Sequence, residues 1–263
     1  MPQGDREMFV FDVPIMVFHD ITSGVPANDQ WRLSVSIQQF ERRMRYLCAH
    51  GYSCISLIEL LQSSGDEQAS QRKRIALTFD DGYESFYNLA YPVLKQFNFT
   101  ATVFLITDRI RESDHQGNGA EAHFLSWRQV KSLYDYGISF GSHTCTHPYL
   151  SQVSSAQVSR ELVSSKEIIE ERLGIMTRLL AYPYGDSNIE VQRMAKIAGY
   201  EAGFGIAGGR SSRFNMWRTQ CHTNDTRLDL VLQLTRWPYY LRWFREETSM
   251  GRFARRVKRA VRR

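Results

Sequence analysis

The sequence predicts an α/β protein whose parallel strands close into a (β/α) barrel. Short β-rich runs alternate with helical patterns along the chain, which is typical of parallel strands joined by helices. About seven or eight such strands in 263 residues suit a closed barrel better than an open sheet. Polar clusters follow several strands, and the carboxyl ends of parallel strands are where such folds hold their active sites.

Eight segments are predicted as strands, because each is a short run of apolar, β-branched or aromatic residues that ends at polar or turn-forming residues. In chain order they are 13–18, 53–56, 74–78, 101–106, 138–142, 179–182, 202–204 and 217–221.

Serine caps, apolar residues at helical spacing and terminal glycines predict the helices. The first begins at Ser34 or Ser36 and ends at Gly51, and a helix over 85–97 is expected despite Pro92. The others are 57–62, 126–137, 154–173, 187–198 and a last one from about 228. The polar stretches 63–73 and 108–123 are expected to be surface loops.

Composition and charge limit the class of protein. A hydrophobic fraction of 43% excludes a wholly disordered chain. The net charge is +5, but residues 252–263 carry seven basic side chains and no acid, which leaves the rest of the chain at −2. A basic groove for nucleic acid is therefore not expected in the body of the protein.

Targeting signals and cysteines suggest a cytoplasmic protein. The first residues contain acids and Pro14, which fit a secretory signal peptide poorly. The sequence contains no run of 18 apolar residues, so a transmembrane helix is not predicted. The four cysteines are too few for a disulfide framework in a chain of 263 residues, so free thiols are expected.

Two adjacent carboxylates follow the strand over 74–78. Asp80 and Asp81 cannot both point the same way in an extended chain, so we expect them to have different roles, with Gly82 allowing a turn. A solvated turn carrying two acids is the alternative interpretation.

A pair of histidines follows the strand over 138–142. His143 and His147 are four residues apart and would fit one metal ion if the segment turned helically. Together with one carboxylate they would make a zinc-type or non-haem iron site. Capping or core histidines, and a thiolate ligand from Cys145, are the alternatives.

The combined motifs carry a resemblance. TFDDG at 78–82, SHTCTHPYL at 142–150 and AYPYG at 181–185 resemble the polysaccharide deacetylase family (NodB-homology domain, carbohydrate esterase family 4). The segment VPIMVFHDI brings the pattern nearest to the poly-N-acetylglucosamine deacetylase branch, and the resemblance covers about residues 13–225. It implies a distorted (β/α) barrel of about seven parallel strands with one divalent metal ion, expected to be zinc.

The resemblance also implies roles for individual residues. Asp81, His143 and His147 match the metal triad, Asp80 matches the catalytic base, and Tyr184 matches the residue whose backbone N–H helps to hold the oxyanion.

Other positions are less well matched. Ala181 stands where the family usually has an arginine, and Arg218 could supply that guanidinium from a later strand or contact the substrate. For the general acid, His19 matches the poly-N-acetylglucosamine deacetylase pattern and is preferred over His222.

Trp127 and Trp217 are candidates to line a sugar-binding groove, with the hydrophobic core as the alternative.

The implied function is a metal-dependent hydrolase that removes N-acetyl groups from a polysaccharide or a lipid-linked saccharide. An O-acetyl esterase, a deformylase and a catalytically silent glycan-binding barrel are the alternatives. We expect a catalytic domain over 1–227 and a C-terminal helical extension over 228–263.

The extension differs in composition from the rest of the chain. Aromatic residues lie among arginines over 237–245, and residues 252–263 have apolar side chains at four-residue spacing among basic ones. Such a basic amphipathic helix could contact an anionic membrane from the cytoplasmic side, whereas a solvated or disordered arm is the alternative. Neither nucleic acid nor a protein partner is indicated.

Overall fold

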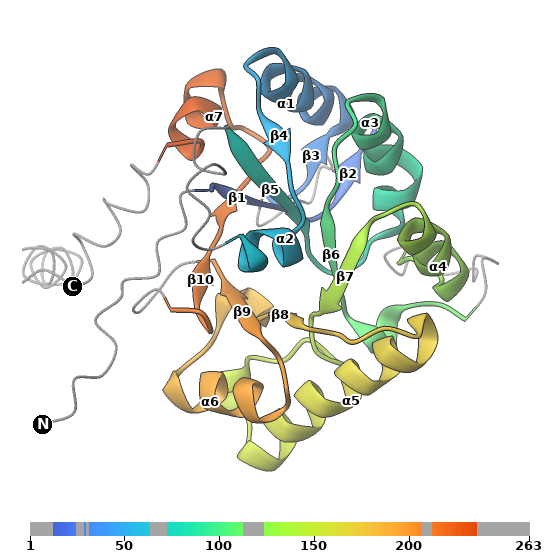
Figure 1. Ribbon diagram of the computed structural model, residues 1–263, viewed down its shortest axis with the longest axis vertical. Helices are drawn as coiled ribbons and strands as arrows, with labels where there is room; N and C mark the ends of the chain where they lie inside the picture. Colours follow the sequence, from blue (N-terminus) through green and yellow to red (C-terminus); the bar gives the residue numbers. More distant parts are fainter. Residues whose placement is uncertain are drawn as a thin grey trace, which may run out of the picture.

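The strands form one parallel sheet that curls into a nearly closed barrel (Figure 1). The computed structural model describes residues 13–24, 29, 32–63, 73–112, 124–206 and 212–235. Within these residues the order around the sheet is β10-β9-β8-β7-β6-β5-β1-β11, and β4 pairs with the start of β5. The strands are β1 (Ile15–Phe18), β4 (Ser53–Cys54), β5 (Arg74–Phe79), β6 (Thr102–Leu105), β7 (Ser139–Ser142), β8 (Leu179–Ala181), β9 (Ala202–Gly205), β10 (Met216–Trp217) and β11 (Thr219–Gln220). The predicted fold class is confirmed.

The segment predicted as one strand over 217–221 closes the barrel as two short strands. β10 pairs with β9 and β11 pairs with β1, so the chain passes from one edge of the sheet to the other. Arg218 lies between them, and its backbone N–H still donates to Gly205 at 3.2 Å. The single strand was therefore a wrong prediction, because the segment changes its pairing partner in the middle. A small sheet of β2 (Ile21–Thr22) and β3 (Val35–Ser36) was not predicted.

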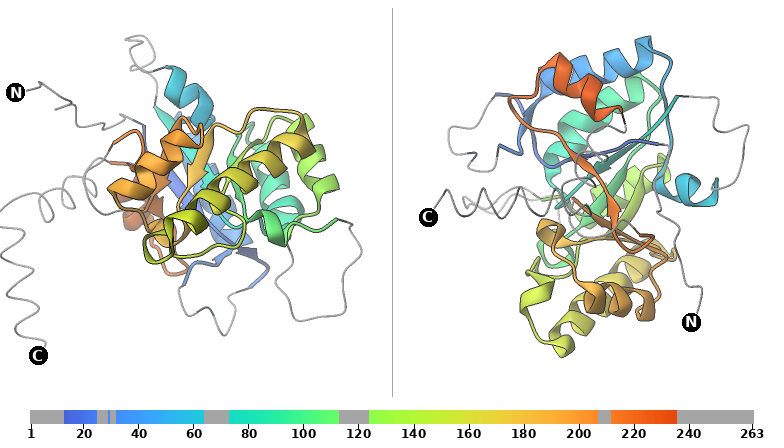
Figure 2. Two further views of the ribbon diagram at one scale, coloured as in Figure 1. Left: turned by 90° about the horizontal axis from the view of Figure 1, so that it is seen from below. Right: turned by 90° about the vertical axis from the view of Figure 1, so that its left-hand side faces the viewer.

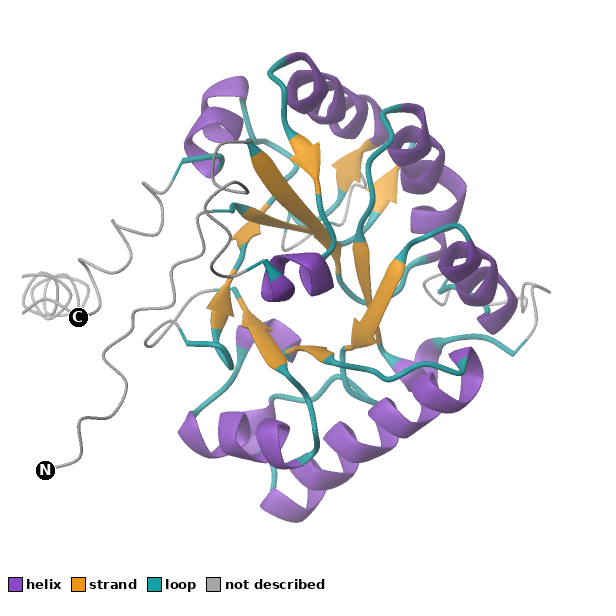
Figure 3. Cartoon of the chain, in the orientation of Figure 1, coloured by secondary structure: helices purple, strands orange, loops and turns teal. Residues whose placement is uncertain are grey.

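All the described helices except α2 surround the strands on the outside of the barrel (Figure 3). The helices are α1 (Ile37–Ala49), α2 (Leu57–Gln62), α3 (Tyr91–Gln96), α4 (Trp127–Asp135), α5 (Ser155–Leu173), α6 (Ile189–Ile197) and α7 (Arg227–Gln233). The expected helix over 85–97 is present as a π-helical segment, η2 (Phe86–Ala90), that runs directly into α3. Pro92 lies inside this continuous helical segment, just after η2, and has no N–H to donate to the preceding turn.

One helix closes the amino-terminal end of the barrel. α2 lies across the opening in Figure 1, and its leucines pack with residues near the starts of β1, β8 and β9. The backbone N–H of Leu57 also donates to the hydroxyl of Thr102, at the start of β6. Figure 2 shows that the long helices α5 and α6 lie together on one side. The carboxyl ends of the strands remain for the functional site.

Several predictions fall outside the described residues. These are the first twelve residues, most of the 63–73 and 108–123 loops, and the aromatic and basic segments beyond residue 235. Among the described helices, none has the length and hydrophobicity needed to cross a membrane. The four cysteines are free thiols in this structure.

Candidate active site

The predicted site residues come together at the carboxyl end of the barrel. His19 follows β1, Asp80 and Asp81 follow β5, and His143 follows β7. Because all these strands are parallel, their carboxyl ends lie at the same end of the barrel.

Asp81, His143 and His147 form a compact group of possible metal ligands. The Nε2 atoms of the two histidines are 3.2 Å apart, and each is 3.5 Å from Oδ1 of Asp81. Ligands about 2.0–2.2 Å from a tetrahedral ion lie roughly 3.3–3.6 Å from one another. The three side chains therefore fit around one ion and leave a position open for water or substrate.

The protonation of the histidines also suits a metal ion. Nδ1 of His143 lies 2.8 Å from the carbonyl oxygen of Ala181, which can only accept, so Nδ1 carries the proton and Nε2 offers a lone pair. Burial and the neighbouring His143 lower the pKa of His147 to about 3, so this imidazole is neutral at pH 7. Burial raises the pKa of Asp81 to about 6, and its hydrogen bond from the Tyr83 hydroxyl opposes that rise. A bound cation would favour the carboxylate form.

The backbone around the histidines is not helical, contrary to the turn assumed from their spacing. Thr144 and His147 have left-handed φ values of 69° and 65°. The hydroxyl of Thr144 accepts a hydrogen bond from the backbone N–H of His147 at 3.1 Å. Cys145 does not join the ligand group, since it is buried against Glu161, and burial raises the pKa of its thiol to about 11.

Glu161 is a site residue that the sequence analysis missed. It lies on α5 and is 5% exposed, and its Oε2 accepts from the backbone N–H groups of Cys145 and Thr146 at 2.8 and 2.9 Å. Its Oε1 accepts from the hydroxyl of Thr146 at 2.6 Å. One buried carboxylate therefore fixes the loop that carries both histidines. The available signal was an acid among the apolar residues of this helix, at a position between Val158 and Leu162.

Asp80 lies beside the possible metal ligands and pairs with Arg218. Nη1 and Nη2 of Arg218 donate to Oδ1 and Oδ2 of Asp80 at 2.7 and 2.8 Å, and both side chains are buried. Burial raises the pKa of Asp80, but the Arg218 guanidinium and His143 outweigh this effect and hold the pKa well below its usual range. Asp80 is thus an ionised carboxylate, with Oδ2 3.9 Å from Nε2 of His143.

The two aspartates separate as expected from their adjacency. Asp81 has a φ of 72° and Gly82 a φ of 78°, which turn the chain after Asp80. A Cβ on Gly82 would lie 3.0 Å from the Leu105 side chain, so the position is also crowded.

Arg218 takes the place of the guanidinium that Ala181 lacks. Ala181 is fully buried at the end of β8, and the arginine from the β10–β11 crossing reaches Asp80 instead. Substrate binding by Arg218 stays a prediction, although its side chain is 0% exposed and its guanidinium donates to Asp80, Thr78 and Gly205.

His19 and His222 lie in the same region of the site. Burial lowers the pKa of His19, whereas the negative charge of Asp80 opposes that effect. Nδ1 of His19 is buried without a hydrogen-bond partner among the described residues. His222 is close enough to affect His19 electrostatically, and its backbone N–H donates to Asp225 at 2.8 Å.

The two tryptophans are not arranged as groove residues. Trp127 is 8% exposed and belongs to the main hydrophobic core, with the Arg172 guanidinium against its ring. Trp217 is 7% exposed in β10, and its indole N–H has no hydrogen-bond partner in the described part of the chain. Their burial favours the hydrophobic core, and a role in lining a sugar-binding groove stays a prediction.

Tyr184 lies in the turn η5 (Pro183–Gly185), with a left-handed φ of 58°. Its ring meets the imidazole of His147 edge to face, with centroids 4.5 Å apart. The turn therefore brings both the backbone and the ring of Tyr184 beside a possible metal ligand.

Comparison with known proteins identifies the family. The family model for polysaccharide deacetylases matches residues 67–203, which is about half of the chain. The chain belongs to the polysaccharide deacetylase family. It is 31% identical over 201 residues to YxkH of Bacillus subtilis, which covers 76% of this chain and 67% of the relative.

Other family members give the same picture. A poly-beta-1,6-N-acetyl-D-glucosamine N-deacetylase of Staphylococcus aureus is 29% identical over 66% of this chain, and the matched part is 61% of that protein's length. Among solved structures, Streptococcus pyogenes deacetylase PplD, in complex with acetate, superposes with a TM-score of 0.73 at 29% identity, covering 85% of this chain and 98% of that one. IcaB from Ammonifex degensii, at 23% identity and a TM-score of 0.65, shares the fold over 86% of this chain and 96% of its own.

Proposed function

We propose that the protein is a metal-dependent deacetylase that removes N-acetyl groups from a polysaccharide or a lipid-linked saccharide. One observation carries this proposal: an ionised carboxylate, Asp80, is held by Arg218 beside a group of three possible ligands. The family relationship supplies the class of reaction. The staphylococcal relative, named for poly-N-acetylglucosamine, supports an N-acetylated glycan as substrate.

Asp81, His143 and His147 would hold one divalent ion, for which we propose zinc because the ligands are two imidazoles and a carboxylate. When bound, the ion supplies Lewis acidity to the acyl carbonyl and to the attacking water.

Asp80 is proposed to act as the general base. Its pKa is held low, so it is ionised throughout the physiological pH range and can take the proton of the attacking water. The backbone N–H of Tyr184 would then donate to the developing oxyanion, an effect of about 3 kcal/mol per donor in comparable sites.

His19 is proposed to protonate the departing amine, which otherwise is a poor leaving group. Burial lowers the pKa of His19, and the negative charge of Asp80 opposes this effect and favours the protonated form that the step needs. General acid catalysis of this kind contributes about 10²–10⁴-fold. His222 is the alternative acid.

Two other chemistries use the same residues. An O-acetyl ester or a formamide also has an acyl carbonyl that water could attack with Asp80 as the base. O-acetyl esterase and deformylase activities are therefore the second candidates. A silent glycan-binding barrel is disfavoured, because the guanidinium missing at Ala181 is supplied by Arg218.

The test is metal analysis combined with release of acetate or formate from a panel of N-acetylated, O-acetylated and N-formylated saccharides. We expect about one divalent ion per chain and acetate from the N-acetylated members. Metal-free protein that releases no acid from any member would contradict the proposal, and preferential release from O-acetyl or N-formyl substrates would favour an alternative chemistry.

We further propose that residues 252–263 bring the enzyme to an anionic membrane surface on the cytoplasmic side, because their seven basic side chains are concentrated in twelve residues. Co-sedimentation with anionic vesicles should fall when these residues are removed. Equal binding by the full and shortened chains would contradict this.

A further inference from the structure

Two tyrosines from different loops form a stacked pair next to His147. The rings of Tyr149 and Tyr184 are 3.9 Å apart between centroids and only 8° from parallel. Tyr184 in turn meets His147 edge to face at 4.5 Å. The three rings make a row that begins at a possible metal ligand and ends at Tyr149.

Both tyrosines keep a large part of their surface open to solvent although their rings stack. Tyr184 is 50% exposed and Tyr149 is 41% exposed, and Tyr184 also contacts His147. A single exposed aromatic ring is ordinary, whereas adjacent exposed rings at a functional site indicate a binding surface.

The loops that carry the pair are fixed to each other. The carboxylate of Asp186 accepts from the backbone N–H and the hydroxyl of Ser151, each at 2.7 Å. Tyr184 also keeps a φ of 58°, a conformation that costs a bulky residue on the order of 1–3 kcal/mol. The pair is therefore built into the fold before any ligand binds.

The chemistry of the pair suits a sugar ring. Aromatic faces carry negative charge density, and a pyranose presents a face of weakly positive C–H groups that can stack on them. Nearby phenolic hydroxyls can exchange hydrogen bonds with sugar hydroxyls. No charge is needed, which matches a neutral N-acetylated glycan.

We propose that Tyr149 and Tyr184 form a subsite that stacks a pyranose ring adjoining the residue that loses its acyl group. The inference rests on the proposed function, since His147 marks where the acyl group reacts. Tyr149 lies beyond Tyr184 in the row, so the sugar it contacts belongs to a neighbouring position along the glycan. The subsite would make the enzyme prefer oligosaccharides over a single sugar.

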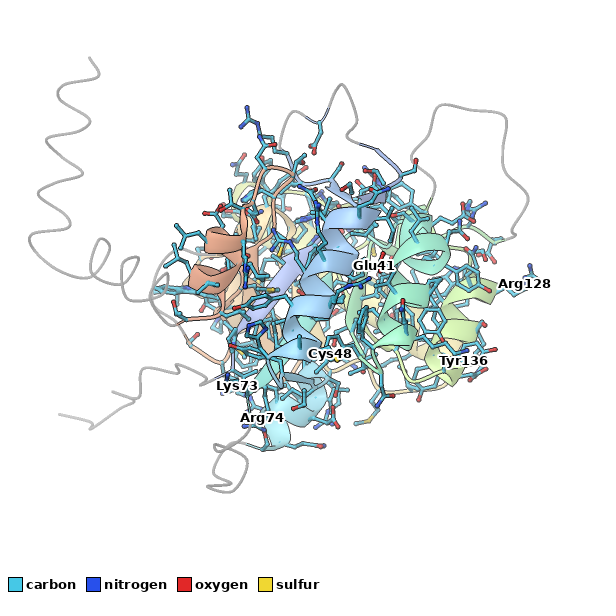
Figure 4. All side chains as sticks on the ribbon, turned by 90° about the horizontal axis from the view of Figure 1, so that it is seen from above. Glu41, Cys48, Lys73, Arg74, Arg128 and Tyr136 are labelled. Atoms are coloured by element: carbon cyan, nitrogen blue, oxygen red, sulfur yellow. The ribbon has the colours of Figure 1, made fainter. Side chains whose placement is uncertain are left out.

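The experiment compares Tyr149→Ala with a matched variant of another exposed tyrosine. Tyr136 is 65% exposed and stacks on Tyr91 at 5.8 Å, and Figure 4 places it at the flank of the barrel beside α4. Acetate release is measured on N-acetylglucosamine and on its oligomers of two to six residues.

Tyr149→Ala should raise KM for the longest oligomers about tenfold, with a much smaller effect on kcat and on the monosaccharide. Tyr149→Phe should restore most of the affinity, and Tyr136→Ala should leave the length dependence unchanged. An equal loss on the monosaccharide and the hexamer, or the same result for both alanine variants, would overturn the subsite.

A binding measurement separates this inference from the proposed reaction. In an Asp80→Asn background, titration with the N-acetylglucosamine tetramer should show binding that Tyr149→Ala weakens about tenfold. Weakened binding in this background, combined with no acetate release by the enzyme that retains Asp80, would support the subsite and contradict N-deacetylation. Unchanged or undetectable binding in both proteins would overturn the subsite whatever the activity.

Discussion

Replacing Arg218 with methionine is the sharpest test of the catalytic arrangement. The guanidinium is fully buried and makes two hydrogen bonds to Asp80, at 2.7 and 2.8 Å, and a third to the hydroxyl of Thr78 at 3.2 Å. Methionine keeps much of the length and apolar surface of the side chain but provides neither the charge nor the donors. Arg218→Lys keeps the charge and loses the two-pronged geometry.

The expected magnitude follows from the burial of the pair. Removing one member of a buried, hydrogen-bonded ion pair costs about 3–5 kcal/mol, because the other charge is left without compensation. Asp80 can escape part of this cost by taking up a proton. Its pKa, now held below the usual range by Arg218 and His143, should rise once burial acts with less opposition.

The stability lost in Arg218→Met should depend on pH. A depressed carboxylate pKa in the folded protein adds stability above the unfolded value of about 3.9, and this stability is lost as pH falls through the folded pKa. In Arg218→Met that contribution is absent and the buried carboxylate is unfavourable. The difference in unfolding free energy from the wild type should therefore be largest near pH 7 and shrink as the pH falls and Asp80 becomes protonated.

The assays are urea unfolding at pH 7 and pH 5 and the pH profile of kcat/KM for acetate release. We expect the acid limb of the profile to move to higher pH by at least about one unit, which corresponds to roughly 1.4 kcal/mol. Arg218→Lys should fall between the two proteins. A folded, metal-containing Arg218→Met protein with an unchanged acid limb would refute the role given to the pair.

Three further predictions follow from the site. Asp80→Asn should abolish acetate release at normal metal content, because an amide cannot take the proton from water; loss of the metal would instead place Asp80 among the ligands. Glu161→Ala should lower the free energy of unfolding by about 1–3 kcal/mol and weaken metal binding, since the buried N–H of Cys145 and the half-buried N–H of Thr146 lose their acceptor. Glu161→Gln keeps an acceptor oxygen and should lose less unfolding free energy. Equal losses in the two variants would contradict the role of Glu161 in fixing the histidine loop. Chelation should lower the midpoint of thermal unfolding, with recovery on adding Zn²⁺; a chelated protein with an unchanged midpoint and full activity would exclude a bound ion.

The elements that depend on local pattern were predictable from the sequence. The apolar runs give β1, β5, β6, β7 and β8 within one or two residues, because each strand is buried on both faces of a parallel sheet. The acids and histidines of the site follow these strands directly. The positions of Asp80, Asp81 and His143 directly after parallel strands were therefore enough to predict that they lie close together.

The features that depend on long-range contact were not predictable in the same way. Glu161 reaches the histidine loop from α5, 16 residues after Cys145 in sequence. The left-handed conformations of Thr144 and His147 depend on such contacts, and no local propensity of threonine or histidine requires them. The stacking of Tyr149 on Tyr184 likewise depends on two loops that meet only in the folded barrel.

The position of Arg218 shows why a missing motif residue does not by itself indicate lost activity. Asp80, the proposed general base, pairs with a guanidinium in this structure, and a barrel interior can be reached from several strands. Arg218 lies 138 residues from Asp80 in sequence, between β10, which pairs with β9, and β11, which pairs with β1. Arg218 lies between the two short strands, its backbone N–H still donates to Gly205, and its side chain is wholly buried. For a family member that lacks the usual arginine, a buried cation within hydrogen-bond reach of the base is thus a better criterion of an intact site than the motif itself.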